Sequence, residues 1–214
     1  MKDKSTYFIN DLIERHSELE YLRKPITDAV KAICGMKEYN KILLCGNGGS
    51  AADSEHMAGE LNKGFILKRK IDNKLVAKLN KQFPEDAEMF EKHLQNGIQS
   101  IPLGSLTGTN TAYLNDCEPS LLFAQGVNVF GKSGDILVCF STSGNSKNVV
   151  NAAKLAKLKG LTIISLTGES GGKLKDLSDI LLNAPSSVTH LIQEYHLPIY
   201  HTICLAVENE IFGE

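Results

Sequence analysis

Two side chains in the first half of the sequence have the types and spacing for proton transfer or metal binding. His56 and Glu60 are four residues apart, so on a helix they lie on one face, about one turn from each other. An imidazole and a carboxylate in this arrangement suit general acid–base chemistry or the coordination of a divalent metal ion. A pair with this spacing is more often a surface or capping pair, so its chemistry depends on the residues around it.

A glycine-rich segment comes directly before this pair. The stretch Lys41–Leu61, KILLCGNGGSAADSEHMAGEL, predicts a buried strand over Lys41–Cys45, a glycine turn over Gly46–Gly49 and a helix from Ser50. The unpaired N–H groups at the start of such a helix bind anions. The sequence therefore predicts an anion-binding loop next to His56 and Glu60.

The spacing Gly46-x-Gly48-x-x-Ala51 also matches the fingerprint of dinucleotide-binding proteins. That fingerprint requires an acidic residue about twenty residues further on, after the next strand. The corresponding stretch here is GFILKRKID, which lies in an irregular basic region, so a nicotinamide-dependent dehydrogenase is not favoured. The Gly-Lys-Ser/Thr of a P-loop is also missing.

Four hydroxyl side chains gather where a second buried strand meets a helix. The strand Gly134–Phe140 (GDILVCF) runs into STSGNS, which contains Ser141, Thr142, Ser143 and Ser146. Hydroxyl groups and free helix N–H groups together bind a phosphate monoester without lysine or arginine. Helix capping explains one such serine, whereas four hydroxyls in six residues predict a phosphate site.

The last predicted helix, from about Thr189 to Ile211, carries further polar candidates. Gln193 and His201 are eight residues apart, about 80° around an ideal helix, so both side chains can reach one ligand. Pro198 lies between them and predicts a kink, because proline removes one backbone hydrogen bond.

The elements that must position these residues alternate between strands and helices. This order predicts an α/β fold, a three-layer sandwich in which helices flank a five-stranded, mostly parallel sheet. Ligands of such sheets bind beyond the carboxyl ends of the strands, where both loops are expected. The chain 1–214 is predicted to be a single domain.

Two segments extend this basic unit. Residues 1–37 are predicted to form an N-terminal helical arm that covers a sheet edge or packs against another subunit. Residues 62–97 form an enlarged, basic and irregular connection with one helix over Glu85–Gln95. We favour a solvated surface excursion for this connection; the alternative is a lid or partner surface whose lysines meet an anionic substrate.

The composition excludes several classes of protein. Of 214 residues, 42% are hydrophobic and 22% are charged, which is ordinary for a globular protein. The net charge of −2 argues against a nucleic-acid partner, and no apolar run approaches the ~18 residues that span a membrane. Five scattered cysteines without a C-x-x-C pair predict reduced thiols and a cytoplasmic protein.

The two loops together resemble those of the SIS (sugar isomerase) family. GNGGSAADSEHMAGEL and STSGNS are similar to segments of the sedoheptulose-7-phosphate isomerases, also called phosphoheptose isomerases, and the resemblance extends from Lys41 to Glu208. It implies a homotetramer with active sites between subunits and a phosphorylated seven-carbon sugar as substrate. The implied reaction converts sedoheptulose 7-phosphate to D-glycero-D-manno-heptose 7-phosphate through an enediol. Its product would serve heptose and surface-polysaccharide (lipopolysaccharide or capsule) biosynthesis.

The resemblance also implies roles for individual residues. Glu60 suits the catalytic base, His201 is the implied acid, and zinc is the implied cofactor, bound by His56, Glu60, Gln193 and His201. Glu60 and Gln193 are also implied to contact the substrate. Its other sugar contacts would fall on Asn47, Gly48, Gly49, Ser50, Asn115 and Asp116, and its phosphate contacts on Ser141, Thr142, Ser143 and Ser146.

Two non-enzymatic alternatives stay open at this point. A relative of the DnaA initiator-associating type is a SIS tetramer that acts as a protein-binding module, and other SIS domains act as sugar-phosphate sensors. Because the initiator-associating branch lacks the counterparts of Glu60 and His201, the presence of both residues favours an enzyme.

Overall fold

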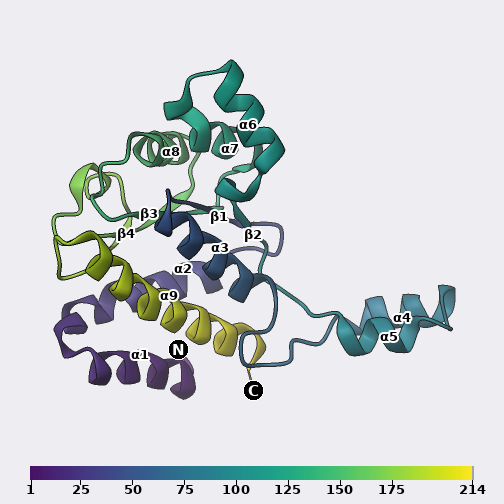
Figure 1. Ribbon diagram of the computed structural model, residues 1–214. Coiled ribbons are helices and arrows are strands. Elements are labelled where there is room, and N and C mark those ends of the chain that lie inside the picture. Colours follow the sequence, from purple (N-terminus) through teal and green to yellow (C-terminus); the bar gives the residue numbers. More distant parts are fainter. Residues whose placement is uncertain (214) are drawn as a thin grey trace.

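The structure, a computed structural model, describes residues 1–213, in which strands alternate with helices (Figure 1). The strands in this range are β1 (Ile42–Cys45), β2 (Ser100–Pro102), β3 (Ile136–Ser141), β4 (Thr162–Thr167) and β5 (Ile180–Asn183). The α-helices are α1 (Asp3–Arg15), α2 (Arg23–Cys34), α3 (Gly49–Asn62), α4 (Asn73–Gln82), α5 (Ala87–His93), α6 (Thr107–Asp116), α7 (Leu122–Phe130), α8 (Lys147–Leu158) and α9 (Thr189–Phe212).

The strands form one sheet in the order β2-β1-β3-β4-β5, and every neighbouring pair is parallel. β1 and β3 are buried along their whole length, as expected for strands covered on both faces. Five parallel strands in a single α/β unit confirm the predicted fold class.

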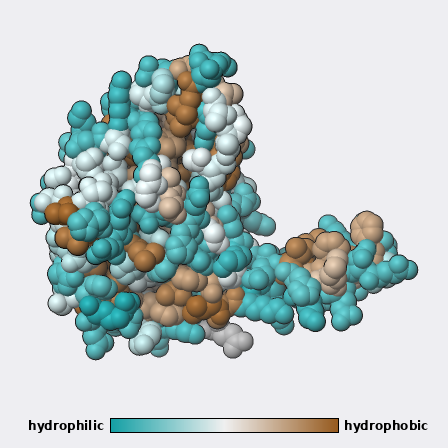
Figure 2. Space-filling view, in the orientation of Figure 1, coloured by the Kyte–Doolittle hydropathy of each residue, from teal (hydrophilic) through white to brown (hydrophobic). Residues whose placement is uncertain are grey.

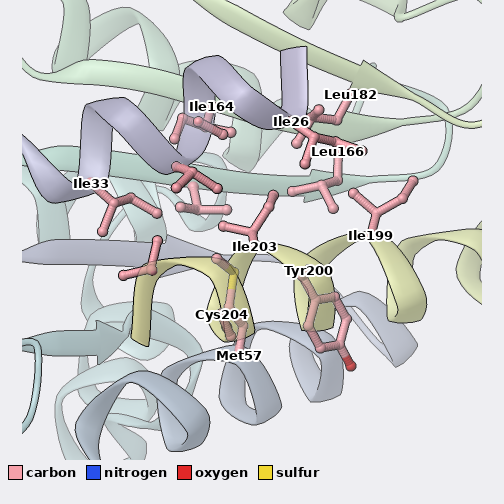
Figure 3. Close-up of a cluster of buried hydrophobic side chains, with 14 of the residues drawn as sticks. Ile26, Ile33, Met57, Ile164, Leu166, Leu182, Ile199, Tyr200, Ile203 and Cys204 are labelled. Carbon is pink, nitrogen blue, oxygen red and sulfur yellow. The ribbon is translucent and has the colours of Figure 1, made fainter. Parts of the chain in front are cut away.

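Alternate residues of the central strands enter two different cores, because successive strand side chains point to opposite faces. On β1, Ile42 and Leu44 join the core formed with α1, α2, α3 and α9, whereas Leu43 and Cys45 join the core formed with α7 and α8. Figure 3 shows the first core, where Ile199 and Ile203 of α9 meet the strand residue Leu166. The sheet therefore has a helical layer on each face, and the three-layer prediction is confirmed.

The N-terminal helices pack within the chain itself. Ile9 and Leu12 of α1 and Ile26 and Val30 of α2 are buried in the same core as α9. The Asn209 side chain donates to the Ser5 hydroxyl at 2.8 Å, which joins α1 to the end of α9. These helices therefore cover the α9 side of the sheet in the single chain.

The connection between α3 and β2 is more regular than the sequence analysis expected. Besides α5, it contains helix α4, which we did not predict; the Asp72 side chain caps that helix by accepting from the Lys74 N–H. The two helices form an arm that extends away from the body of the molecule, with hydrophobic side chains along it (Figures 1 and 2). Leu75, Phe83 and Met89 are all exposed there.

Helix α9 continues through Pro198 for 24 residues. The proline therefore does not interrupt the helix between Gln193 and His201. No helix within residues 1–213 is both long and apolar enough to cross a membrane.

Candidate active site

The two predicted anion loops lie next to each other because β1 and β3 are adjacent, parallel strands. The Asn47 and Asn148 side chains exchange two hydrogen bonds, at 3.0 and 2.9 Å, across the gap between the loops. Gly48 has a φ of +56°, a left-handed conformation that favours glycine at the entrance of α3. The loops of the sequence prediction are thus brought together at the carboxyl ends of the strands.

The hydroxyl-rich loop has the form of a cradle. The Ser141 Oγ donates to the Ser146 Oγ at 3.1 Å, and the Ser143 Oγ accepts from the Asn145 N–H at the same distance. Gly144 has a φ of +65°, and a Cβ at this position would lie 2.0 Å from the Gly171 carbonyl oxygen. Glycine is therefore required at 144 for the loop to close, and the surrounding hydroxyls suit a phosphate.

Helices α3 and α9 run side by side and bring three of the predicted catalytic and metal-binding residues together (Figure 1). The His56 Nε2 lies 3.4 Å from the His201 Nε2 and 3.5 Å from the Glu60 Oε1. We call His56, Glu60 and His201 the histidine–glutamate cluster. The two helices therefore meet at these positions.

Each oxygen of the Glu60 carboxylate faces a nitrogen atom of another side chain. Oε1 faces His56, and Oε2 lies 3.1 Å from the Lys63 ammonium nitrogen. The Glu60 side chain is only 13% exposed, whereas that of His56 is 46% exposed. A substrate can therefore reach the cluster, and the carboxylate has a defined position beside it.

His201 occupies a partly buried position between aromatic rings. The ring centroids of Phe65 and Tyr200 lie 5.3 and 5.0 Å from that of His201. Burial lowers the pKa of His201, the neighbouring His56 lowers it further, and Glu60 acts in the opposite direction. The net shift favours the neutral imidazole, which can exchange a proton with a substrate oxygen.

The donor atoms of the cluster fit part of a zinc site. Two Zn–N bonds of about 2.0–2.1 Å at a tetrahedral angle place their nitrogens about 3.3–3.4 Å apart, close to the observed spacing of the two Nε2 atoms. Nevertheless, residues 1–213 contain no group of three or more His, Cys, Asp and Glu side chains already arranged around a metal position. The donors thus match zinc in type and in two of their spacings, without a complete preformed site.

Gln193 lies apart from the other predicted metal ligands. Its amide packs against Gly49, where a Cβ would lie 2.5 Å from the Gln193 Nε2. Gln193 and His56 nevertheless line the same cleft, of about 450 Å³, between α3 and α9. The structure therefore places Gln193 at one end of the cleft, beside the glycine loop.

The same cleft contains residues that the sequence analysis did not select. Asp53, His190 and Tyr200 all line it. Asp53 is one turn before His56, and Tyr200 directly precedes His201. In the sequence, only their short distance from His56, His201 and Gln193 could have pointed to these three residues. Many other residues lie equally near, so this distance alone could not have selected them.

Asn115 and Asp116 are not joined to either loop by the described hydrogen bonds. They lie at the end of α6, where the Asn115 amide donates to the Asp116 carboxylate at 2.8 Å. Their implied role as sugar contacts therefore stays a prediction.

The fold and the site define an α/β protein with a glycine-rich and a hydroxyl-rich loop at the carboxyl ends of a parallel sheet. The family model described as "SIS domain" matches residues 7–100 and 96–168. The phosphoheptose isomerase of Aliarcobacter butzleri is 39% identical over 194 residues, which covers 90% of this chain and 89% of that protein.

Solved structures extend the similarity to three dimensions. The phosphoheptose isomerase of Neisseria gonorrhoeae is 32% identical, with a TM-score of 0.72 and coverage of 94% of each chain. That of Francisella tularensis is 29% identical, with a TM-score of 0.74 and coverage of 98% of this chain and all of the other. The chain belongs to the SIS domain family and, within it, to the phosphoheptose isomerases.

Proposed function

We propose that the protein converts sedoheptulose 7-phosphate to D-glycero-D-manno-heptose 7-phosphate through an enediol. The observation that carries this proposal is the position of the Glu60 carboxylate beside His56 and His201. Aldose–ketose isomerisation requires a base that moves a proton between adjacent carbons and a group that exchanges a proton with the oxygens. A well-positioned carboxylate beside a neutral imidazole supplies both.

In this mechanism Glu60 removes a proton from the carbon next to the carbonyl and returns it to the neighbouring carbon. His201 transfers the proton on the oxygens, for which its lowered pKa suits it. Ser141, Thr142, Ser143 and Ser146 would hold the phosphate, from a neighbouring copy of the chain as argued below, and so fix which carbons face Glu60. A protein-binding module or a sugar-phosphate sensor, the two non-enzymatic alternatives, has no need of a base and an acid. Neither alternative therefore explains why Glu60 and His201 lie close together.

The direct test is incubation of the purified protein with sedoheptulose 7-phosphate, with the sugar products resolved by chromatography and NMR. We expect an aldoheptose 7-phosphate to appear and the Glu60→Gln variant to form almost none. Absence of turnover by the folded, metal-replete wild type would favour one of the non-enzymatic alternatives.

Zinc is proposed as the cofactor because the donors of the cluster suit it. His56, Glu60 and His201 would hold the ion. Gln193 stays a predicted ligand, because its amide packs against Gly49, far along α3 from Glu60. A divalent metal ion at this position polarises substrate oxygens as a Lewis acid.

We expect thorough chelation to lower kcat by at least about 100-fold and stoichiometric zinc to restore it. Elemental analysis of the same samples is the second measurement. Full activity in a sample with no detectable metal would contradict the zinc proposal and leave the roles of Glu60 and His201 in place.

A homotetramer with active sites between subunits is proposed for a geometric reason. Gly49 and Glu60 are eleven residues apart on α3, about 16 Å at 1.5 Å per residue, which is longer than an extended seven-carbon chain. The glycine loop and the base of one chain are therefore too far apart along α3 for one sugar to meet both, and a second copy would supply the missing half. Sedimentation equilibrium should give the mass of four chains; a stable, active monomer would contradict this proposal.

The cellular setting is proposed to be the cytoplasm, in heptose synthesis for surface polysaccharide. All five cysteines are free, as expected in a reducing compartment.

A further inference from the structure

Tyr200 combines a buried ring with a hydroxyl that leaves the core. The residue is 1% exposed, and its ring lies 5.8 Å from that of Phe140 between their centroids. Figure 3 shows the hydroxyl on the side of the ring that faces helix α3. Core packing therefore explains the ring of Tyr200 but leaves the hydroxyl unexplained.

The hydroxyl contacts two polar side chains of α3. The Tyr200 Oη lies 3.1 Å from the His56 Nδ1 and 3.5 Å from the Asp53 Oδ1. Since an ionised carboxylate only accepts hydrogen bonds, the single Tyr200 proton goes to Asp53. The His56 Nδ1 must then carry a proton and donate it to the Tyr200 oxygen.

This direction of hydrogen bonding decides the state of the other His56 nitrogen. With the proton on Nδ1, the Nε2 of a neutral ring carries a lone pair. That lone pair faces the His201 Nε2 and the Glu60 Oε1 at 3.4 and 3.5 Å. The His56 ring thus presents an acceptor, and not a donor, to Glu60 and His201.

Asp53 is poorly suited to a purely structural role. Its Oδ2 is buried and has no hydrogen-bond partner among residues 1–213. Burial raises the pKa of Asp53 to about 6, while the Tyr200 hydroxyl and His56 oppose this effect. Because an unsatisfied buried carboxylate oxygen is destabilising, its retention here points to a task beyond packing.

We propose that Tyr200 and Asp53 are positioning residues, which fix the ring orientation and the tautomer of His56 so that its Nε2 lone pair faces Glu60 and His201. In this proposal both residues act through His56. The kinetic part of this inference rests on the proposed isomerase function. The tautomer itself does not, and it can be observed in the metal-free protein.

The first measurement is the tautomer of His56, read from long-range ¹H–¹⁵N correlations of metal-free protein labelled with ¹⁵N-histidine. We expect Nδ1 to be protonated in the wild type. Tyr200→Phe retains the ring and loses only the hydroxyl, which is the acceptor of the His56 Nδ1–H. The His56 proton should then move to Nε2, from which it can donate to Glu60. The same tautomer in both proteins would overturn the proposal.

The second measurement is kinetic. Loss of a partner behind a ligating histidine typically costs 10–100-fold in activity or metal affinity, so we expect kcat of Tyr200→Phe to fall by about that factor with KM within about twofold. Tyr195→Phe is the matched control, since Tyr195 is on the same helix but packs against His16. An unchanged kcat in an active Tyr200→Phe enzyme would overturn the positioning role.

Variants of Asp53 test the chain of hydrogen bonds from its far end. Asp53→Asn retains an oxygen that accepts from Tyr200 and should keep the wild-type tautomer. Asp53→Ala frees the Tyr200 proton to go to the His56 Nδ1 and should move the His56 proton to Nε2. Equal tautomers in the two Asp53 variants would contradict the inference even if Tyr200→Phe fails to fold. Conversely, these tautomer shifts in a protein without isomerase activity would refute the proposed function and leave the positioning network standing.

Discussion

Glu60→Gln is expected to lower kcat for sedoheptulose 7-phosphate by about 10³-fold or more, with little change in substrate binding. Glutamine has nearly the same shape, but its amide cannot take a proton from carbon, and a positioned general base contributes about 10²–10⁴-fold. The measurement is the initial rate of aldoheptose 7-phosphate formation over a range of substrate concentrations. Equal losses in kcat and kcat/KM would place the effect on the transition state.

The control for this variant is Glu55→Gln. Glu55 is on the same helix and exposed, and its carboxylate accepts from the Ser105 hydroxyl, away from the cluster. It should retain the wild-type kcat. If Glu60→Gln were as active as Glu55→Gln, the base would have to be another group, and the proposed mechanism would be wrong.

The parts of the structure that were predictable from the sequence are those with strong local patterns. Continuous apolar runs predicted β1 and β3, and the glycine and hydroxyl segments after them predicted the two loops that the Asn47–Asn148 bonds now join. His56 and Glu60 share a helix face by spacing alone. Their meeting with His201 was implied by family resemblance, since spacing within one helix carries no information about a second helix.

The parts that were missed depend on contacts between distant segments or on a weak local pattern. Helix α4 carries its apolar stripe on Leu75, Val76 and Leu79 among lysines, and none of its residues is buried, so its amphipathic signal was read as a solvated connection. Tyr200 was not selected, because only the fold brings its hydroxyl to His56. The partners of Arg69 were equally invisible, since one of them is 139 residues away.

A buried ion pair between Arg69 and Glu208 fixes the end of α3 next to Glu60, the proposed base. Both side chains are fully buried, with the Arg69 Nε 2.8 Å from the Glu208 Oε1. The guanidinium also donates to the carbonyl oxygens of Glu60 at 2.9 Å and Leu61 at 2.7 Å. Arg69 therefore pairs a charge and satisfies the last carbonyls of the helix that carries Glu60.

Glu208 completes the arrangement from α9. Its carboxylate accepts from the backbone N–H groups of Phe65, Ile66 and Leu67 at 2.7, 2.9 and 3.2 Å. Burial alone would raise the pKa of Glu208, but these N–H groups and Arg69 together lower it below its usual value. Its contribution to stability is therefore complete above the pKa of an unfolded glutamate, about 4.3, and is lost as the pH falls below it.

Arg69→Met is expected to destabilise the protein by about 3–5 kcal/mol, because it leaves the Glu208 charge buried without its partner. For a chain of this size, that loss corresponds to a fall in Tm of roughly 6–20 °C, measured by calorimetry. In the folded fraction, kcat should also fall by more than about tenfold, since displacing Glu60 even slightly misaligns the proton transfer.

The exposed pair Arg23–Glu20 separates burial from charge as the cause of this loss. Its contact is equally short, at 2.7 Å, but its side chains are 40% and 59% exposed, so Arg23→Met should cost at most about 1 kcal/mol. The double variant Arg69→Met/Glu208→Leu should lose less free energy of unfolding than the sum of the two single variants. Each single variant leaves one buried charge without a partner, whereas the double variant removes both charges. Strictly additive losses in the free energy of unfolding would mean that Arg69 and Glu208 do not stabilise the protein as a pair. An unchanged kcat in Arg69→Met would mean that the pair does not position Glu60.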